Sequence, residues 1–169
     1  LNSFIEADEE WDWEDFPEGL RNDVTIKGEI VGVPYRQDIR TLWYNQDMLG
    51  NAGFDAAPTT WDEFLAVAMA TAEKGDSGFN IEGFHFSDGD GNWQRDWQPY
   101  LMFVEMAGGS FLSEDLTSCT LNEAPAVEAL EFLYSMIHEH EVTSYPGLST
   151  QGDLNVLAGR HAAMQMSSA

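Results

Sequence analysis

The chain has 169 residues, of which 43% are hydrophobic, enough to fill a core and to exclude a disordered acidic tail. Its 30 aspartates and glutamates against 7 lysines and arginines give a formal net charge of -23, which disfavours partners such as nucleic acid or an anionic membrane. No apolar run approaches the roughly 20 residues that a membrane-spanning helix needs.

The acidic residues are spread along the whole chain, and such a charge repels itself unless salt screens it. Because molar salt shortens the Debye length to roughly 3 Å, this pattern favours a halophilic protein over an ordinary acidic domain. The densest run, residues 6–18, carries three aromatic side chains and is interpreted as a solvated edge, with a partner-binding tail as the alternative. The single cysteine, Cys119, allows no internal disulfide. Residues 1–10 lack the basic start and the apolar stretch of a signal peptide, residue 1 is not methionine, and the last residues resemble a strand cut short, so we expect a fragment that lacks material at both ends.

Strand-like and helix-like segments alternate, as is typical of an α/β protein. In the first half, the pattern predicts a loop or short helix over 11–20, two short strands around Lys27-Gly28 within 25–33, a strand over 41–44 and a helix over 46–52. A capping box formed by Thr60 and Glu63 then opens a helix that continues up to Lys74-Gly75.

The second half continues the alternation. It predicts a strand over 83–86 with Phe84 and Phe86 on one face, then a polar loop over 87–92 and a helix over 93–107. A short strand over 119–121 and a helix that opens at 122–125 follow. The last predicted elements are a helix over 151–158 and a strand over 162–166. The buried face of the helix that opens at 122–125 is predicted to carry Val127, Leu130, Leu133, Tyr134 and Ile137.

Five segments, in this order, resemble the family 1 extracellular solute-binding proteins, the sugar receptors of ABC importers. They are KGEIVGVPY at 27–35, DIRTLWYNQDML at 38–49, Ala52-Gly53 followed by PTTWDEF at 58–64, Gly108-Gly109, and LAGRHAAM at 157–164. Each segment alone is a weak signal, but their common order across nearly the whole chain is a specific one.

The resemblance implies a periplasmic-binding-protein-like (type II) α/β fold, in which two lobes joined by a hinge enclose a solute. Residues 1–36 then form the end of the first lobe and the hinge entry, and residues 37–169 form most of an incomplete second lobe. The implied protein is no enzyme and needs no cofactor. It is a monomer outside the cell or at its surface (periplasmic in a Gram-negative cell), anchored to the membrane at full length, and its partners are a sugar and the permease subunits of the importer.

A sugar site needs planar polar groups to pair the hydroxyls and aromatic rings to stack on the C–H face. By the resemblance, Asp38 binds sugar hydroxyls at the hinge. Arg40, two residues on, projects to the same side of an extended segment and either binds solute or pairs with Asp38. Tyr35, also near the hinge, is a third candidate.

A second set of candidates opens the helix that starts at the cleft in this family. Trp93 and Trp97 lie one helical turn apart and so share a face. Asp96 and Gln98 align with cleft contacts in maltose-binding relatives. The plainer interpretation is that one tryptophan belongs to the core and that the polar residues only cap the helix. Trp61 is expected to pack at a helix start.

Two other functions compete with a receptor. A carbohydrate-active hydrolase would use a carboxylate pair such as Asp38 and Asp96 across the scissile bond, and a non-catalytic interaction domain would need neither. No metal site is predicted. The segment 88–92 begins like a calcium loop but lacks its later glycine and glutamate, and His138 and His140 do not share a helix face.

Overall fold

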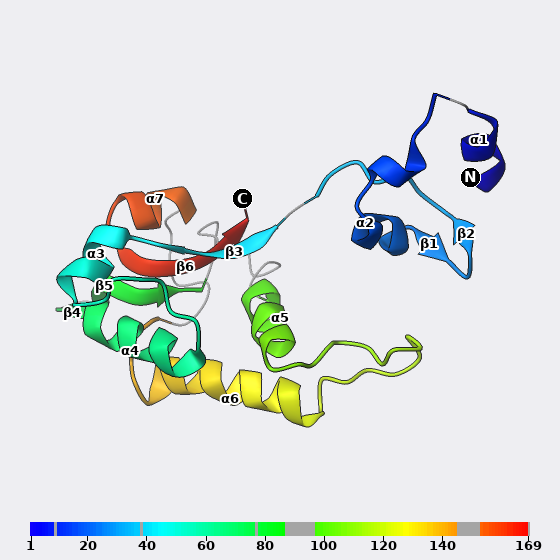
Figure 1. The fold of residues 1–169 in the computed structure, drawn as a ribbon. Coiled ribbons are helices and arrows are strands. Elements are labelled where there is room, and N and C mark those ends of the chain that lie inside the picture. The colour runs from blue at the N-terminus through cyan, green and yellow to red at the C-terminus, as the bar shows by residue number, and fades with distance from the viewer. Residues whose placement is uncertain (9, 38, 77, 87–96, 145–152, 169) are drawn as a thin grey trace. The chain divides into compact units, whose positions relative to one another are not determined.

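The computed structural model describes residues 1–8, 10–37, 39–76, 78–86, 97–144 and 153–168 (Figure 1). They form two compact units, Leu1–Ile39 and Arg40–Ser168. The division falls close to the predicted lobe boundary after residue 36, although the assignment of the units to two lobes stays a prediction. Within the part of the chain that is described, no helix has the length and apolar character needed to cross a membrane.

The first unit contains two short helices, a 3-10 turn and a hairpin. These are α1 (Asn2–Ala7), η1 (Trp13–Asp15), α2 (Glu18–Asp23), β1 (Thr25–Ile26) and β2 (Glu29–Ile30). Lys27 and Gly28 have φ angles of 52° and 82°, and a two-residue hairpin turn of type I′ requires both to be positive. The predicted pair of strands is therefore confirmed. The Asn2 side chain ties α1 to this hairpin, because it accepts from the Ile30 amide at 2.8 Å and donates to the Gly28 carbonyl at 3.2 Å.

The second unit is built on a four-stranded sheet in the order β3-β6-β5-β4. Its strands are β3 (Arg40–Tyr44), β4 (Glu73–Gly75), β5 (Gly78–His85) and β6 (Ala162–Ser168). Its helices are α3 (Gln46–Asn51), α4 (Trp61–Thr71), α5 (Trp97–Met106), α6 (Ala124–His138) and α7 (Asp153–Ala158). β5 and β6 run parallel, whereas the other two neighbouring pairs are antiparallel.

An aromatic cluster joins the sheet to the helices of this unit. The rings of Phe64 in α4, Phe84 in β5 and Phe103 in α5 lie 5.0 to 6.2 Å apart, and all three side chains are buried. Phe84 also contacts Phe86 at 4.9 Å, as expected of two side chains on one face. Trp61 stacks on Phe132 at 4.7 Å, so the predicted packing at the start of α4 is confirmed.

The start of α4 follows the predicted capping pattern with one difference. The Thr60 hydroxyl accepts from the Glu63 amide at 3.2 Å, as an N-cap does. The Glu63 carboxylate, however, accepts from the amide and the hydroxyl of Thr59, each at 2.8 Å, and not from the amide of Thr60. The helix start is therefore fixed by two consecutive threonines.

Replacing Thr60 with alanine should lower the free energy of unfolding by about 1 kcal/mol, because the Glu63 amide loses its capping partner. Urea unfolding followed by circular dichroism would measure the change. Thr60→Ser keeps the hydroxyl and serves as the control, with an expected change of less than about 0.5 kcal/mol. Equal losses in the two variants would show that the hydroxyl does not cap α4.

Pairing with β5 changes the predicted end of α4. The helix ends at Thr71, three residues earlier than predicted, because Glu73–Gly75 forms β4 instead. β5 in turn begins at Gly78 and not at Gly83, since it pairs with β4 through Glu73↔Ile81. The predicted strand over 119–121 is reduced to a single bridge between Cys119 and Leu112.

The buried face of α6 also differs from the prediction. Val127, Leu130 and Tyr134 are 41%, 57% and 56% exposed. Leu133 is buried as predicted and Ile137 packs partly buried against the core, but the other buried residues are Ala126, Ala129 and Met136. Small alanine side chains let α6 approach α5 closely, so that the Tyr100 hydroxyl donates to the Ala126 carbonyl at 3.1 Å. The prediction was wrong for Val127, Leu130 and Tyr134, because packing against α5 buries the alanine positions beside them.

Candidate functional site

One edge of the four-stranded sheet gathers the ends of three strands. β3 begins at Arg40, which pairs with Ser168 at the end of β6. β5 ends at His85, which pairs with Gln165 of β6. Because β5 and β6 are parallel, their carboxyl ends lie at the same edge, which is where open α/β sheets bind their ligands. We call this the carboxyl edge, defined by His85, Ser168 and Arg40.

The structure places one predicted site residue directly at this edge. Arg40 is half-buried at the first position of β3. Tyr35 belongs to the other unit and is 99% exposed. Three further candidates, Asp38, Trp93 and Asp96, lie outside the described residues. Their assignment to a binding site therefore stays a prediction.

The start of α5 carries the two remaining candidates. Trp97 is the first residue of the helix, is 50% exposed and has its ring 6.5 Å from that of Phe111. Gln98 follows it, half-buried, and its Oε1 atom is buried with no hydrogen-bond partner among the described residues. An exposed aromatic ring and an unpaired amide oxygen on consecutive residues are groups of the kind that sugar binding uses.

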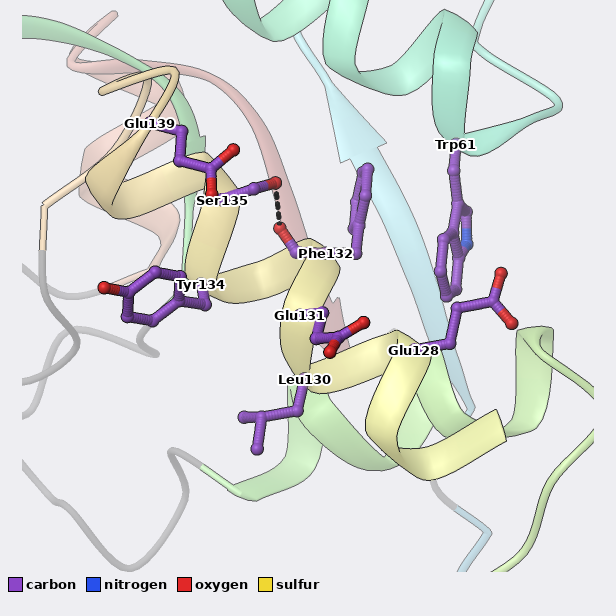
Figure 2. Close-up of a pocket in the computed structure, with 8 residues that line it drawn as sticks. All are labelled: Trp61, Glu128, Leu130, Glu131, Phe132, Tyr134, Ser135 and Glu139. Atoms are coloured by element: carbon purple, nitrogen blue, oxygen red, sulfur yellow. Dashed lines mark hydrogen bonds between the residues drawn. The ribbon is translucent and has the colours of Figure 1, made fainter. Parts of the chain in front are cut away.

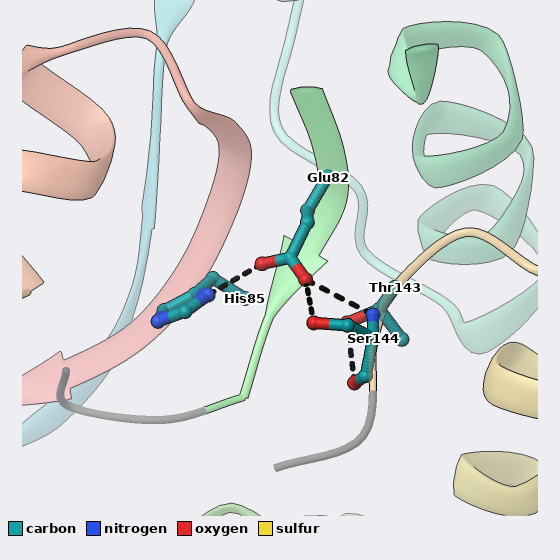
Figure 3. Close-up of polar contacts among 4 residues, drawn as sticks. All are labelled: Glu82, His85, Thr143 and Ser144. Carbon is teal, nitrogen blue, oxygen red and sulfur yellow. Dashed lines mark hydrogen bonds and ion pairs between the residues drawn. The ribbon is translucent and has the colours of Figure 1, made fainter. Parts of the chain in front are cut away.

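A buried polar cluster lies at the carboxyl end of β5, and sequence reasoning missed it (Figure 3). The Glu82 carboxylate lies 2.5 Å from Nδ1 of His85 and accepts from the Ser144 amide at 3.0 Å and from the Ser144 hydroxyl. Thr143, the residue before Ser144, is also buried. These hydrogen bonds hold the segment that follows α6 against β5. The Gly83 amide contributes a further hydrogen bond, because it donates to the Val142 carbonyl at 2.8 Å.

The environment of Glu82 favours its ionised form. Burial alone would raise the pKa of Glu82, but hydrogen bonds from His85 and Ser144 and the electrostatic attraction of His85 outweigh that effect. The pKa of this carboxyl therefore lies below its ordinary value. The available signal was the presence of Glu82, His85 and Gln165 within otherwise apolar strand segments, because a buried strand position rarely carries a polar residue without a partner.

Two of the surface hollows in the described part of the second unit are lined by residues that include no predicted site residue. The larger, of about 730 Å³, is lined by residues of α6 and by Trp61. Figure 2 shows Leu130 and Tyr134 on one side of α6 and Trp61 on another. The smaller, of about 290 Å³, lies between α3, α4 and Arg160. Residues on different sides of one helix do not converge on a ligand, so the larger hollow is not assigned as a site.

The predictions about metal concern two segments. The segment 88–92 lies outside the described residues. Within the described residues, no group of three or more His, Cys, Asp or Glu side chains is placed to hold a metal ion. His138 contacts Tyr134, with ring centroids 4.3 Å apart.

Comparison with known proteins assigns the chain to a family. The family model for bacterial extracellular solute-binding proteins matches residues 1–169. The chain belongs to this family. The predicted family is thereby confirmed, and the family places the solute-binding protein outside the cytoplasm, extracellular or periplasmic.

Individual relatives agree with this assignment. An arabinooligosaccharide-binding protein of Halalkalibacterium halodurans is 25% identical over 128 residues, which are 75% of this chain and 26% of the relative. An ABC transporter solute-binding protein of Thermotoga lettingae, solved with α-D-tagatose, is 26% identical with a TM-score of 0.76, covering 98% of this chain and 41% of that one. This solute-binding protein thus spans a quarter to two-fifths of the relatives that it matches.

The fold is periplasmic-binding-protein-like, as predicted. A substrate-binding protein of Listeria monocytogenes, solved in complex with cycloalternan, has a TM-score of 0.77 at 24% identity. The match covers 99% of this chain and 42% of that one. The α/β fold of that protein is therefore shared over nearly all of this chain.

Proposed function

We propose that the chain is part of the extracellular sugar receptor of an ABC importer. In this proposal, residues 1–36 end the first lobe and residues 37–169 supply most of the second, and a neutral sugar or oligosaccharide binds between the lobes. The closed receptor then delivers the solute to the permease subunits, and the full-length protein is anchored at the membrane. The supporting observation is the carboxyl edge, since it gathers Arg40 and the ends of β5 and β6 in a chain of this family.

The choice of a sugar rests on chemistry and on relatives. The relatives named above bind arabinooligosaccharide or were solved with tagatose. Asp38, Asp96 and Gln98 would pair hydroxyl groups, and Trp93 and Trp97 would stack on the C–H face, with Tyr35 and Arg40 at the hinge. An anionic solute fits a chain with a net charge of -23 poorly.

Replacing Asp38 with alanine should weaken sugar binding about 10-fold or more, because one or two charged hydrogen bonds to hydroxyls are lost. A panel that includes arabinooligosaccharides, tagatose, maltose and lactose would first be screened by thermal shift. Titration calorimetry would then give the affinity for the best solute. Both the chain and the longest reading frame that encodes it should be tested.

Asp55→Ala is the matched control, because Asp55 is an exposed aspartate in the loop between α3 and α4. It should leave the affinity unchanged. If no sugar in the panel raises the melting temperature of the wild type, the receptor proposal fails. If sugar binds and Asp38→Ala has the wild-type affinity, Asp38 does not belong to the site although the receptor proposal stands.

A further inference from the structure

Three adjacent strands place an aromatic, an amide and an imidazole side chain in one row. Gln165 of β6 pairs with Trp43 of β3 on one side and with His85 of β5 on the other. Directly paired residues of neighbouring strands project to the same face of a sheet. Trp43, Gln165 and His85 therefore share a face, and the two polar side chains lie at or near the carboxyl edge.

The polar atoms of this row are buried but have no partners. His85 and Gln165 are each 1% exposed. Nε2 of His85 and both amide atoms of Gln165 have no hydrogen-bond partner among the residues that the structure describes. Figure 3 shows the imidazole extending away from Glu82, so Nδ1 is occupied while Nε2 is not. An unpaired buried polar group is costly, and these three atoms belong to two directly paired residues, so one polar molecule bound by both side chains would remove that cost.

The chemistry of the three atoms selects a neutral hydroxyl. The Gln165 amide offers one acceptor and one donor group, and Nε2 of His85 accepts when the ring is neutral and donates when it is protonated. A hydroxyl both donates and accepts, so it can pair with these atoms in either protonation state. Half-buried Trp43, in the same row, adds an apolar ring surface of the kind on which a C–H face packs.

We propose that His85 and Gln165 form a subsite that binds one neutral hydroxyl group. The hydroxyl belongs either to an ordered water or to the sugar itself. Binding of a sugar hydroxyl rests on the proposed receptor function, whereas binding of an ordered water does not. In this proposal Gln165 and His85 act at the carboxyl edge, where β5 ends and pairs with β6.

The first test is the stability of Gln165→Met in sugar-free buffer. Methionine has a similar length but no hydrogen-bonding amide. If the subsite holds water, this variant should melt about 3–6 °C below the wild type, because the hydrogen bonds between the Gln165 amide and that water are lost. Met166→Leu, a change of similar volume at the neighbouring buried position, is the control, with an expected shift below about 3 °C. An unchanged or raised melting temperature of Gln165→Met, together with unchanged sugar affinity, would overturn the proposal, because removing truly unpaired polar atoms is neutral or stabilising.

The second test identifies the source of the hydroxyl by calorimetry with the sugar that the wild type binds best. A loss of affinity of about 10-fold or more in Gln165→Met assigns the hydroxyl to the sugar. A lowered melting temperature with wild-type affinity assigns it to water. If the wild type binds no sugar, the receptor proposal fails, and the stability test alone still decides whether the subsite exists.

A double variant tests whether the two side chains share one hydroxyl. In His85→Asn, the amide nitrogen replaces Nδ1 and can still donate to Glu82, but the position of Nε2 is lost. Combined with Gln165→Met, it should lower the melting temperature by less than the sum of the two single losses, because either change alone removes the shared bridge. Full additivity would show that His85 and Gln165 do not bind the same group.

Discussion

Replacing Gly83 with alanine is expected to lower the free energy of unfolding by about 3 kcal/mol or more. A Cβ atom at Gly83 would lie 2.1 Å from the carbonyl oxygen of Ala68 and 2.7 Å from its Cα atom. These are backbone atoms of α4, so no side-chain rotation can relieve the contact. Either α4 moves away from β5, which breaks the packing of Phe64 on Phe84, or β5 itself shifts.

Urea unfolding followed by tryptophan fluorescence would measure this loss. Gly50→Ala is the matched control, because a Cβ at Gly50 meets nothing within 4 Å and the residue lies inside α3. Alanine should stabilise that helix by about 0.5–1 kcal/mol. A loss at Gly83 of less than about 1 kcal/mol would mean that α4 and β5 are not in close contact at Ala68.

The second large effect is expected at Glu82. Replacing it with methionine removes the acceptor of the Ser144 amide and hydroxyl and the partner of His85, all of them at least partly buried. Each buried donor left unpaired costs about 1–3 kcal/mol, so a total loss of about 3 kcal/mol is expected at pH 7. Glu82→Gln should lose less, because its amide oxygen can still accept from Ser144. Glu128→Gln, at an exposed position of α6, should change the stability by less than about 0.5 kcal/mol.

The pH dependence of stability gives a separate measurement of the same cluster. Because the folded state holds the pKa of Glu82 below its ordinary value of 4.5, the contribution of this carboxylate is complete above that value. It is lost as the pH falls from there through the folded-state pKa, since the folded protein resists taking up the proton. The free energy of unfolding, measured at several pH values from 7 down to 3, should therefore decrease less steeply in Glu82→Gln than in the wild type. Parallel profiles would show that the cluster does not stabilise ionised Glu82.

Local signals were enough to predict several elements. The positive φ angles of Lys27-Gly28, the threonine cap of α4 and the alternation at Phe84 and Phe86 all follow from short-range chemistry. Elements that depend on distant partners were harder to predict. β4 exists because β5 pairs with it, and the buried stripe of α6 is chosen by its fit against α5, which the spacing of apolar residues alone does not reveal.

The residues of the candidate site also separate into those that the sequence predicted and those that depend on distant partners. Order and spacing of motifs were sufficient to predict the family, which the family model confirms. They also indicated Arg40, which the register of β3 with β6 places at the carboxyl edge. Glu82, His85 and Gln165 were missed because their roles depend on which strands are neighbours and on where the segment after α6 passes. No local pattern around any one of them contains that information.

The central place of β6 in the sheet affects how the protein is made in the cell. β6 separates β3 from β5, and it is synthesised after both of them. While the ribosome is still producing the residues before Ala162, β3 and β5 each lack the neighbour that joins them, and the aromatic side chains of β5 have only part of their core. Non-local pairing of this kind is slow and leaves apolar surface exposed meanwhile. The sheet can therefore be completed only after β6 has been made, and a stop codon shortly before Ala162 would yield a product without a sheet that joins β3 to β5.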